Sequence, residues 1–460
     1  MPRILAYAIR RLSRTRFRHV LLCAFALAST SCDTTEFLGI EDPDIINPSN
    51  VQSAAGANAV RLGALARLNQ ATSGGESLLL LGGLFTDEWI NGDSFIGRQE
   101  VDQRTITIQN SFVTDASRSL HRARLAAHQA LDLLAEFAPT APGWQPAEMY
   151  FVQAYIENLA AENFCNGVVF SSVVDGLEVY GSPMTVADAF ARALAHADSG
   201  LALVTGTTTT DVRVRNALQV VRGRILLNLN RPADAATAVT GVPTNFKYEM
   251  LHAQTATSNQ MWSFNNLAWR YSVGASEGTN GINFATAGDP RLPVCTGGDA
   301  VCRANGVTRT TRDDLRAPLL VQLVWPIRES SVAITSGIEA RMIEAEAQLR
   351  AQNAAGALAT LNAARGTVTG LTPLTDAGSE AARVDQLFRE RAIWLFGRGY
   401  RMGDMRRLVR QYNRPADSVF PVGLWHKGGN YGADVTFPVP QAEQNNPNVP
   451  AGQTCIDRNA

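Results

Sequence analysis

Apolar residues recur every three to four positions along much of the chain, a pattern that predicts amphipathic helices. The clearest stripes lie near 117–137, after Pro146, after Thr185, across 214–229 and from Ile338 onward. Proline suits the first turn of a helix, and Thr185 followed by Asp188 predicts a variant of the capping box. The alternating pattern of strands is weak throughout, as at 105–108. We therefore expect a mainly α fold.

Two segments predict helix pairs in which a long helix, a short break and an alanine-rich helix follow one another. They are NALQVVRGRILLNLNRPADAATAV and IEARMIEAEAQLRAQNAAGALATLNAAR, the second paired across Gly356. This pattern resembles tetratricopeptide repeats, whose helix pairs stack and bury each other's apolar faces. Spacing between the pairs is irregular, so we expect no uniform array. Such pairs are predicted at about 117–240 and 336–410.

Two stretches lack the helical period. Glycine, asparagine, threonine and aromatic residues dominate between about 255 and 330, and a second irregular stretch runs from about Arg414 to the C terminus. Loops of this length inside a compact domain are usually functional. We expect residues 59–460 to form one α domain with a loop-rich insert at about 255–330.

The N terminus has the order of a secretory signal peptide, which we place at residues 1–31. Six arginines without any acidic residue precede an apolar run from Val20 to Ala28, and small residues then lead to Cys32. Nine apolar residues are too few to cross a bilayer, which needs about 20. The segment resembles the lipobox of bacterial lipoproteins, although Ser29 stands where that motif usually has leucine. The resemblance implies lipid attachment at Cys32 and an extended lead over 32–58. Ordinary cleavage, with Cys32 as a free or bridged thiol, is the alternative.

The charge balance changes once the signal peptide is removed. The whole chain of 460 residues has 41 basic and 42 acidic side chains, but the chain without residues 1–31 has 35 and 42, a net charge of −7. A mildly acidic protein is a poor partner for a phosphate backbone. We therefore expect no nucleic-acid partner.

Cysteine usage agrees with export. Two of the six cysteines lie in or directly after the predicted signal peptide, and Cys165, Cys295, Cys302 and Cys455 remain. Four thiols in an oxidising compartment suggest two disulfides, with three possible pairings. The short glycine-rich loop between Cys295 and Cys302 favours a local bridge, which would leave Cys165 to join Cys455. Zinc is disfavoured because the spacing lacks paired Cys-x-x-Cys units.

The common catalytic motifs are missing from the sequence. It contains no Gly-x-Ser-x-Gly elbow, no His-Glu-x-x-His pair and no phosphate loop, and only two lysines. We expect no enzyme activity, no cofactor and no metal. A pair of carboxylates hidden among the 42 acidic residues keeps an exported glycan hydrolase as an alternative.

Four motifs, taken in chain order, resemble the SusD/RagB family of outer-membrane nutrient-binding lipoproteins. They are Gly288-Asp289-Pro290-Arg291, EARMIEAEAQL, FRERAIWLFGRGYRMGDMRRLVR (388–410) and FPVPQAEQNNPN (437–448). With the lipobox-like Cys32, the resemblance covers nearly all of the mature chain. The residues that match the family's signature are Asp289, Arg291, Glu390, Arg391, Arg401, Asp404 and Arg406. Arg398 stands where the family often has an acidic residue.

This resemblance implies both a fold and a role. It implies an α-superhelical body of tetratricopeptide-like pairs whose irregular loops hold the ligand. It implies a lipid-anchored protein of the outer membrane, facing the cell surface, with a TonB-dependent transporter of the SusC-like type as partner. The ligand would be an oligosaccharide or a peptide, delivered without catalysis. An envelope scaffold that holds other proteins through its helix pairs is a further alternative.

Aromatic residues in the irregular insert are the candidate ligand contacts. Trp262, Phe264, Trp269 and Tyr271 fall within ten positions, next to the amide of Asn265, and Trp89 is a secondary candidate. Aromatic faces stack on sugar rings, and amides bind hydroxyls. The alternative is that these rings fill a small core of their own. The mixed charges of the signature residues predict a network of salt bridges and helix caps, with a turn at Asp289.

Overall fold

The computed structural model of the chain describes residues 51–174, 177–285 and 287–460. The predicted signal peptide, Cys32 and the lead as far as residue 50 lie outside the described residues. Residues Ser53–Ala460 form one compact unit. Within the described ranges, no helix combines the length and the apolarity that crossing a bilayer would require.

Long helices build the first half of this unit. They are α4 (Ala54–Ser73), α7 (Ser111–Phe137), α8 (Trp144–Asn163), α9 (Val186–Leu203) and α10 (Thr209–Asn228). Each of α7 to α10 packs against the next, and α4 packs along α7. The predicted start of α9 is confirmed, because the Thr185 hydroxyl accepts a hydrogen bond from the Asp188 backbone N at 3.1 Å. Pro146 lies in the first turn of α8, as predicted.

The two predicted helix pairs are present in the second half. They are α10 with α11 (Pro232–Ala238) and α14 (Gly337–Arg350) with α15 (Ala354–Arg365), followed by α16 (Glu380–Trp394). α11 packs on α14, so the pairs stack as in a helical repeat. Gly356 was expected at the break between α14 and α15, but it lies in the first turn of α15. The helix begins earlier because the Asn353 side chain accepts a hydrogen bond from the Gly356 backbone N at 3.0 Å.

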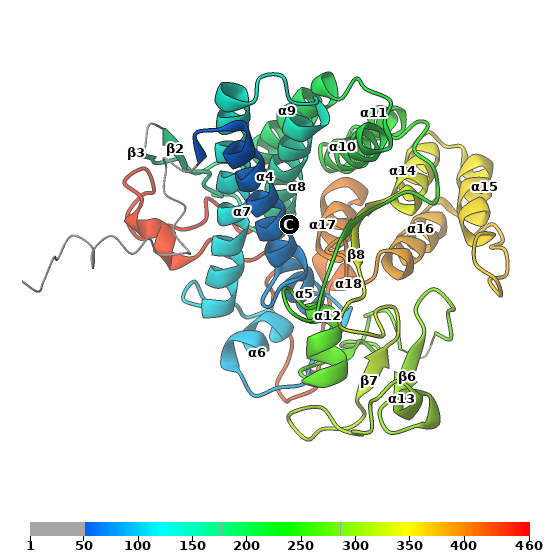
Figure 1. Ribbon diagram of the computed structural model, residues 1–460. Helices are drawn as coiled ribbons and strands as arrows, with labels where there is room; N and C mark the ends of the chain where they lie inside the picture. The colour runs from blue at the N-terminus through cyan, green and yellow to red at the C-terminus, as the bar shows by residue number, and fades with distance from the viewer. Residues whose placement is uncertain (1–50, 175–176, 286) are drawn as a thin grey trace, which may run out of the picture. The chain divides into compact units, whose positions relative to one another are not determined.

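Two helices occupy the interior of this arrangement. α5 (Leu78–Phe85) is buried along its whole length, and α17 (Arg401–Tyr412) packs against both α5 and α8. Figure 1 shows α17 between α8 on one side and α14 and α16 on the other. The prediction of a mainly α, tetratricopeptide-like body is confirmed.

Short elements make up the rest of the described residues. The short helices are α6 (Ile96–Gln103), α12 (Gln260–Trp262), a π-helical turn η1 (Ser263–Leu267), α13 (Ala300–Ala304), α18 (Ala416–Val419) and a 3-10 turn η2 (Gln441–Asn445). The strands are β1 (Trp89–Asn91), β2 (Ser172–Val174), β3 (Leu177–Val179), β4 (Lys247–Met250), β5 (Tyr271–Val273), β6 (Val294–Thr296), β7 (Leu320–Gln322) and β8 (Val332–Ser336).

The strands pair only in twos, and all pairs are antiparallel. β1 pairs with β5, β2 with β3, β4 with β8 and β6 with β7. The weak alternating pattern at 105–108 forms no strand; this segment is a loop and turn that leads into α7. Figure 1 shows α6, α12, α13, β6 and β7 gathered below the helices. The irregular insert therefore folds into loops and short elements, which lie beside α6 and join the body through the β1–β5 pair.

Both favoured disulfides are present. Cys165 is bonded to Cys455, and Cys295 to Cys302. The first bridge holds the C-terminal segment at the end of α8, where the Cys165 backbone N also donates to the Phe437 carbonyl at 2.9 Å. The second joins β6 to α13 inside a small apolar cluster.

Candidate functional site

Six of the seven signature residues form ion pairs, most of them buried. The Asp289 carboxylate accepts a hydrogen bond from the Arg291 backbone N at 3.0 Å, which is the predicted turn. The Arg291 guanidinium bridges Asp289 and Glu390, with an N–O distance of 2.6 Å to each. Glu390 also accepts from Arg365 at 2.7 Å. The turn before β6 is thereby fixed to helices α15 and α16.

A second group of ion pairs joins α16 to α17 and α14. Arg391 donates to both oxygens of Asp404 at 2.8 Å, and Arg407 donates to Asp404 at 2.8 Å. Burial disfavours the charged form of Asp404, but the two guanidinium groups outweigh burial and lower its pKa to about 2. Asp404 is therefore a charged, fully paired residue of the interior.

The remaining two signature residues attach α17 to the rest of the body. Arg401 binds Asp87 through two N–O contacts of 2.7 Å. Arg406 donates to the backbone oxygens of Ala161 and Glu162 at 2.8 Å, and to that of Phe164 at 3.1 Å. These carbonyls belong to the end of α8, where the last turn of a helix lacks backbone partners. The contacts of the signature residues thus join helices and turns of the body to one another.

Three of the six predicted ligand contacts lie in the core. Trp89 in β1 and Tyr271 in β5 are fully buried, and so is Asn265. The Asn265 side chain donates to the Tyr271 carbonyl at 2.7 Å and accepts from the Gln322 backbone N at 2.9 Å. The structure does not support ligand contact by Trp89, Asn265 and Tyr271, because the β1–β5 pairing and the π-helical turn point them inward.

The other three candidates differ in exposure. Phe264 is also buried, and its ring lies 5.5 Å from that of Tyr271. Trp262 and Trp269 are partly exposed. The Arg309 guanidinium covers one face of Trp269, 4.4 Å from the ring centroid, and Trp269 also packs on the cluster that contains the Cys295–Cys302 bridge. The rings of Trp89, Phe264 and Tyr271 therefore belong to the core, whereas Trp262 and Trp269 keep exposed surface that a ligand could contact.

The most exposed aromatic side chain near these rings is Phe95, directly before α6. Its side chain is 48% exposed. Two successive hydrogen bonds of 2.9 Å, from the Asp93 backbone N to Asn91 and from the Phe95 backbone N to Asp93, fix the turn that presents it. Arg98 lies 5.2 Å from the Phe95 ring and pairs with Asp93. The ring is therefore held in place by a buried cation.

Charged side chains border Phe95. Arg270 lies 5.4 Å from its ring and 3.9 Å from the carboxylate of Asp313, and this pair is partly exposed. The Asp313 backbone N donates to the Trp269 carbonyl at 3.1 Å. We call Phe95, Trp269, Arg270, Arg309 and Asp313 the loop face. An exposed ring beside a cationic donor and an anionic acceptor can bind a molecule that has both an apolar face and hydroxyl groups.

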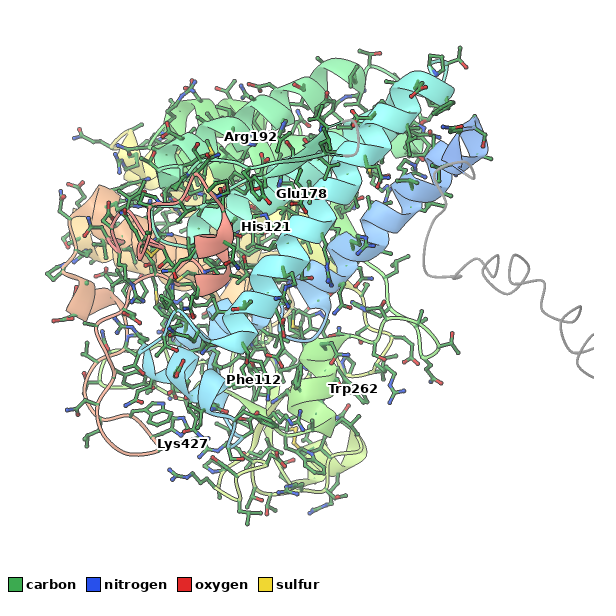
Figure 2. All side chains as sticks on the ribbon, turned by 90° about the vertical axis from the view of Figure 1, so that its left-hand side faces the viewer. Phe112, His121, Glu178, Arg192, Trp262 and Lys427 are labelled. Atoms are coloured by element: carbon green, nitrogen blue, oxygen red, sulfur yellow. A yellow bond between two sulfur atoms is a disulfide. The ribbon has the colours of Figure 1, made fainter. Side chains whose placement is uncertain are left out.

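The sequence analysis missed Phe95. The run Asn91-Gly92-Asp93-Ser94 is a turn signal directly before it. An aromatic residue between such a turn and a helix start is a candidate for exposure, and this signal could have identified it. Figure 2 shows the neighbouring side chains Phe112 and Trp262 toward the same end of the helical body, away from Arg192.

A cluster of acidic and imidazole groups was also missed. The Asp102 carboxylate accepts from Trp425 Nε1 at 2.8 Å and lies 2.8 Å from His426 Nε2. Glu277 lies beside Asp102 and accepts a hydrogen bond from the Tyr431 hydroxyl. Burial, together with the negative charge of Asp102, raises the pKa of Glu277 to about 8. Residues far apart in the sequence build this cluster, so spacing gave no signal.

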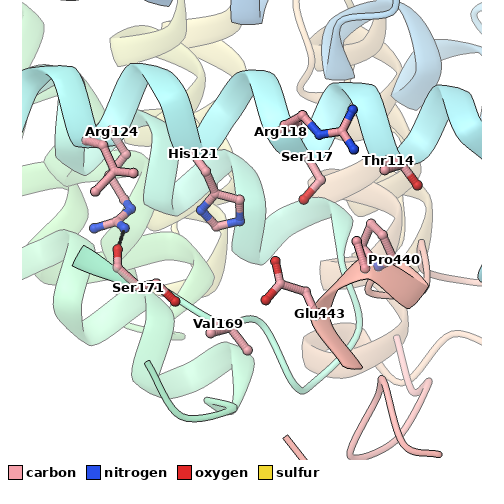
Figure 3. A pocket seen from close by; sticks show the side chains of 11 residues that line it. Thr114, Ser117, Arg118, His121, Arg124, Val169, Ser171, Pro440 and Glu443 are labelled. Carbon is pink, nitrogen blue, oxygen red and sulfur yellow. Dashed lines mark hydrogen bonds between the residues drawn. The ribbon is translucent and has the colours of Figure 1, made fainter. Parts of the chain in front are cut away.

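Two cavities lie on the helical body, away from the loop face. The cavity between α7 and the C-terminal segment, shown in Figure 3, is lined by Ser117, His121, Arg124 and Glu443 and has a volume of about 190 Å³. Pockets for drug-sized ligands typically occupy 300–1,000 Å³. Burial, and then the charge of Arg124, lower the pKa of His121 to about 4, so this imidazole is neutral at pH 7. A groove of about 600 Å³ beside α4 and α7 is large enough, but Trp, Tyr and Phe are absent from its lining.

Comparisons with known proteins identify the fold. No protein-family model matches the chain. No curated protein matches it either. Among solved structures, a SusD superfamily protein from Parabacteroides distasonis is 15% identical, with a TM-score of 0.64, over 86% of this chain and 98% of that one.

Two further solved structures agree. A SusD superfamily protein from Bacteroides fragilis is 15% identical, with a TM-score of 0.59, over 87% of this chain and 99% of that one. A protein described as a laminarin-binding SusD-like protein is 15% identical, with a TM-score of 0.54, over 86% of this chain and 98% of that one. These matches show that the chain has the SusD-like fold, which agrees with its stacked helix pairs.

Proposed function

We propose that the protein is a glycan-binding protein of the cell surface, which captures an oligosaccharide at the loop face without altering it. The observation that carries this proposal is the exposed ring of Phe95 beside the Arg270–Asp313 pair. The SusD-like fold supports it, because one protein with this fold is described as laminarin binding.

The chemistry of the loop face matches a sugar. The apolar face of a pyranose ring would stack on Phe95, and its hydroxyls would accept from Arg270 and donate to Asp313. Both charged side chains are partly solvated, so binding would not require the removal of a buried charge from its partner. Capture and release need only such reversible contacts.

The proposal also includes where the protein lies in the cell and which transporter it works with. The order of residues before Cys32 supports a lipid anchor, and the fold supports a place in the cell envelope. The resemblance to the SusD/RagB family supports the outer membrane and a TonB-dependent transporter of the SusC-like type as the partner. Co-purification of the lipidated protein with such a transporter from detergent-solubilised membranes would test the partnership. Its recovery without the transporter would count against it.

Titration calorimetry against a panel of oligosaccharides and peptides tests the ligand class. Oligosaccharides of laminarin are the first members to measure, because one solved structure of this fold is described as a laminarin-binding SusD-like protein. We expect saturable glycan binding that Phe95→Ala weakens about tenfold, since an aromatic stacking contact contributes about 0.5–1.5 kcal/mol beyond the buried area. Leu177→Ala is the matched control, because Leu177 is also an exposed apolar residue but lies in the β2–β3 hairpin. Exclusive binding of peptides, or a Phe95 variant with unchanged glycan affinity, would contradict the proposal.

The glycan hydrolase alternative predicts a different outcome. Mass spectrometry of the bound oligosaccharide after prolonged incubation should show the unshortened molecule if the protein only captures it. Shortened products, formed by the wild-type protein and lost with a carboxylate variant of the loop face such as Asp313→Asn, would favour catalysis.

A further inference from the structure

We propose that Asp102, Glu277 and His426 form a binding site for a divalent transition-metal ion. One ligand atom from each residue lies within 4.8 Å of the ligand atoms of the other two. Asp102 and Glu277 are only 1% and 4% exposed. The His426 side chain is 18% exposed, which gives the cluster one side open to solvent. This proposal does not depend on the function of the loop face.

The separations in the cluster suit a common ion. Zinc binds imidazole nitrogen and carboxylate oxygen at about 2.0–2.2 Å, so neighbouring ligand atoms around one ion lie roughly 3–3.5 Å apart. The observed 2.8 Å between Asp102 Oδ2 and His426 Nε2 is close to this value. The other separations need to shorten by at most about 1–2 Å. Side-chain rotation can supply movements of that size.

Neighbouring groups already orient the three side chains. Trp425 Nε1 donates to Asp102 at 2.8 Å, and the Tyr431 hydroxyl donates to Glu277. Hydrogen bonds of this kind hold the ligands of known metal sites in position. The other ring nitrogen of His426, Nδ1, is buried and has no hydrogen-bond partner among the described residues. It can carry the ring proton while Nε2 binds the ion.

The local charge also favours a cation. Two buried carboxylates lie together, and the guanidinium nearby, that of Arg312, is shared: it interacts with both carboxylates and also lies 3.7 Å from Asp314. Buried charges are stable only when paired or when they coordinate a metal. A divalent ion would balance Asp102 and Glu277 at once.

The ligand set indicates the class of ion. Two carboxylate oxygens and one imidazole nitrogen suit Zn²⁺, Mn²⁺ or Co²⁺, whereas Ca²⁺ prefers six to eight oxygen ligands. Cys295, Asp299 and Cys302 also lie close together, but the two sulfur atoms are joined in a disulfide and cannot bind a metal as thiolates. The Asp102 cluster is therefore the better candidate.

An ion at this site would join three distant segments of the chain. Asp102 lies in α6, Glu277 follows β5, and His426 lies in the C-terminal irregular segment. The His426 carbonyl accepts from Arg316 at 2.6 Å, and Lys427 pairs with Asp314 at 2.9 Å. The turn that carries Asp313 of the loop face is thus tied to the segment that carries His426.

Metal titration of the chelator-treated full-length protein tests this site. We expect one equivalent of Zn²⁺ to bind in calorimetry, visible absorbance bands when Co²⁺ is the probe, and a rise of several degrees in the melting temperature. Ca²⁺ should produce neither a comparable heat nor a comparable rise. Glycan is absent from these measurements, so their outcome is separate from that of the proposed function.

Two variants and one control complete the test. His426→Gln and Asp102→Asn should each weaken Zn²⁺ binding at least 100-fold and abolish the Co²⁺ bands, with native circular dichroism confirming the fold. His128→Gln removes another histidine that faces an aspartate, Asp132, at 3.9 Å on the surface of α7, and should leave binding unchanged. If the wild-type protein binds no Zn²⁺, prefers Ca²⁺, or keeps its affinity in both variants, the proposal is wrong.

Discussion

Asp404→Asn is the most informative change to the buried ion pairs. Asp404 accepts two hydrogen bonds from Arg391 and one from Arg407, and both arginine side chains are 2% exposed. Asparagine keeps the shape but removes the negative charge, and its amide group then faces a guanidinium. Glu346 would be left as the one carboxylate beside both arginines.

The expected loss follows from the burial of this network. Removing one partner of a buried ion pair costs about 3–5 kcal/mol, because the remaining charge stays desolvated. A domain is typically stable by about 5–15 kcal/mol. We therefore expect Asp404→Asn to remove a large fraction of the free energy of unfolding and to lower the urea midpoint markedly.

Urea unfolding followed by circular dichroism measures this loss, and the chain offers a matched control. Arg383 binds Asp376 through the same two-contact geometry, with N–O distances of 2.6 and 2.7 Å. The Asp376 side chain is 49% exposed, however, so water replaces the lost contacts. We expect Asp376→Asn to leave the midpoint almost unchanged. Equal shifts for the two variants would refute the argument that burial makes the Asp404 network important.

Further predictions concern acid stability, the Cys165–Cys455 disulfide, the Trp269 ring and membrane attachment. Because folding lowers the pKa of Asp404 from 3.8 to about 2, its carboxylate stabilises the folded state above pH 4, and this stabilisation is lost as the pH falls toward 2. The unfolding free energy, measured as a function of pH, should fall by about 2 kcal/mol over this range. Replacing Cys165 and Cys455 by alanine opens a loop with a sequence separation of 290, and the unfolding free energy should fall by about 6 kcal/mol in the chain-entropy model. An unchanged urea midpoint would exclude this. Trp269→Ala should weaken glycan binding in calorimetry and also lower the melting temperature, since this ring packs on an apolar cluster. If the glycan affinity and the melting temperature both stay unchanged, Trp269 is not part of the binding surface. Cys32→Ala should move the protein from the membrane fraction to the soluble fraction on immunoblots, and its persistence in membranes would contradict the lipid anchor.

Local signals in the sequence identified much of the scaffold. The 3.6-residue period of α7 and α9 reflects burial of one helix face, whereas α8 is buried on nearly all sides. The start of α9 at Thr185 depends on a single side chain. The disulfide between Cys295 and Cys302 depends on a short loop. Each of these features depends on residues close together in the sequence, so the sequence alone can predict it.

The sequence could not predict which residues of the candidate site are exposed. Strands β1 and β5 are three residues long, too short for an alternating pattern, so nothing local indicated that these strands pair and bring the rings of Trp89 and Tyr271 into contact in the interior. The exposure of Phe95 depends on Arg98 and Asp93 holding a turn. The Asp102 cluster forms only when three distant segments meet. Tertiary packing, not local pattern, decides these positions.

A crystal structure with the tightest-binding oligosaccharide from the panel tests the central claim most directly. The account predicts a sugar ring stacked on Phe95, with hydroxyl contacts to Arg270 and Asp313 and an intact glycosidic chain. An oligosaccharide bound instead in the groove beside α4 and α7, with Phe95 exposed as before, would contradict it.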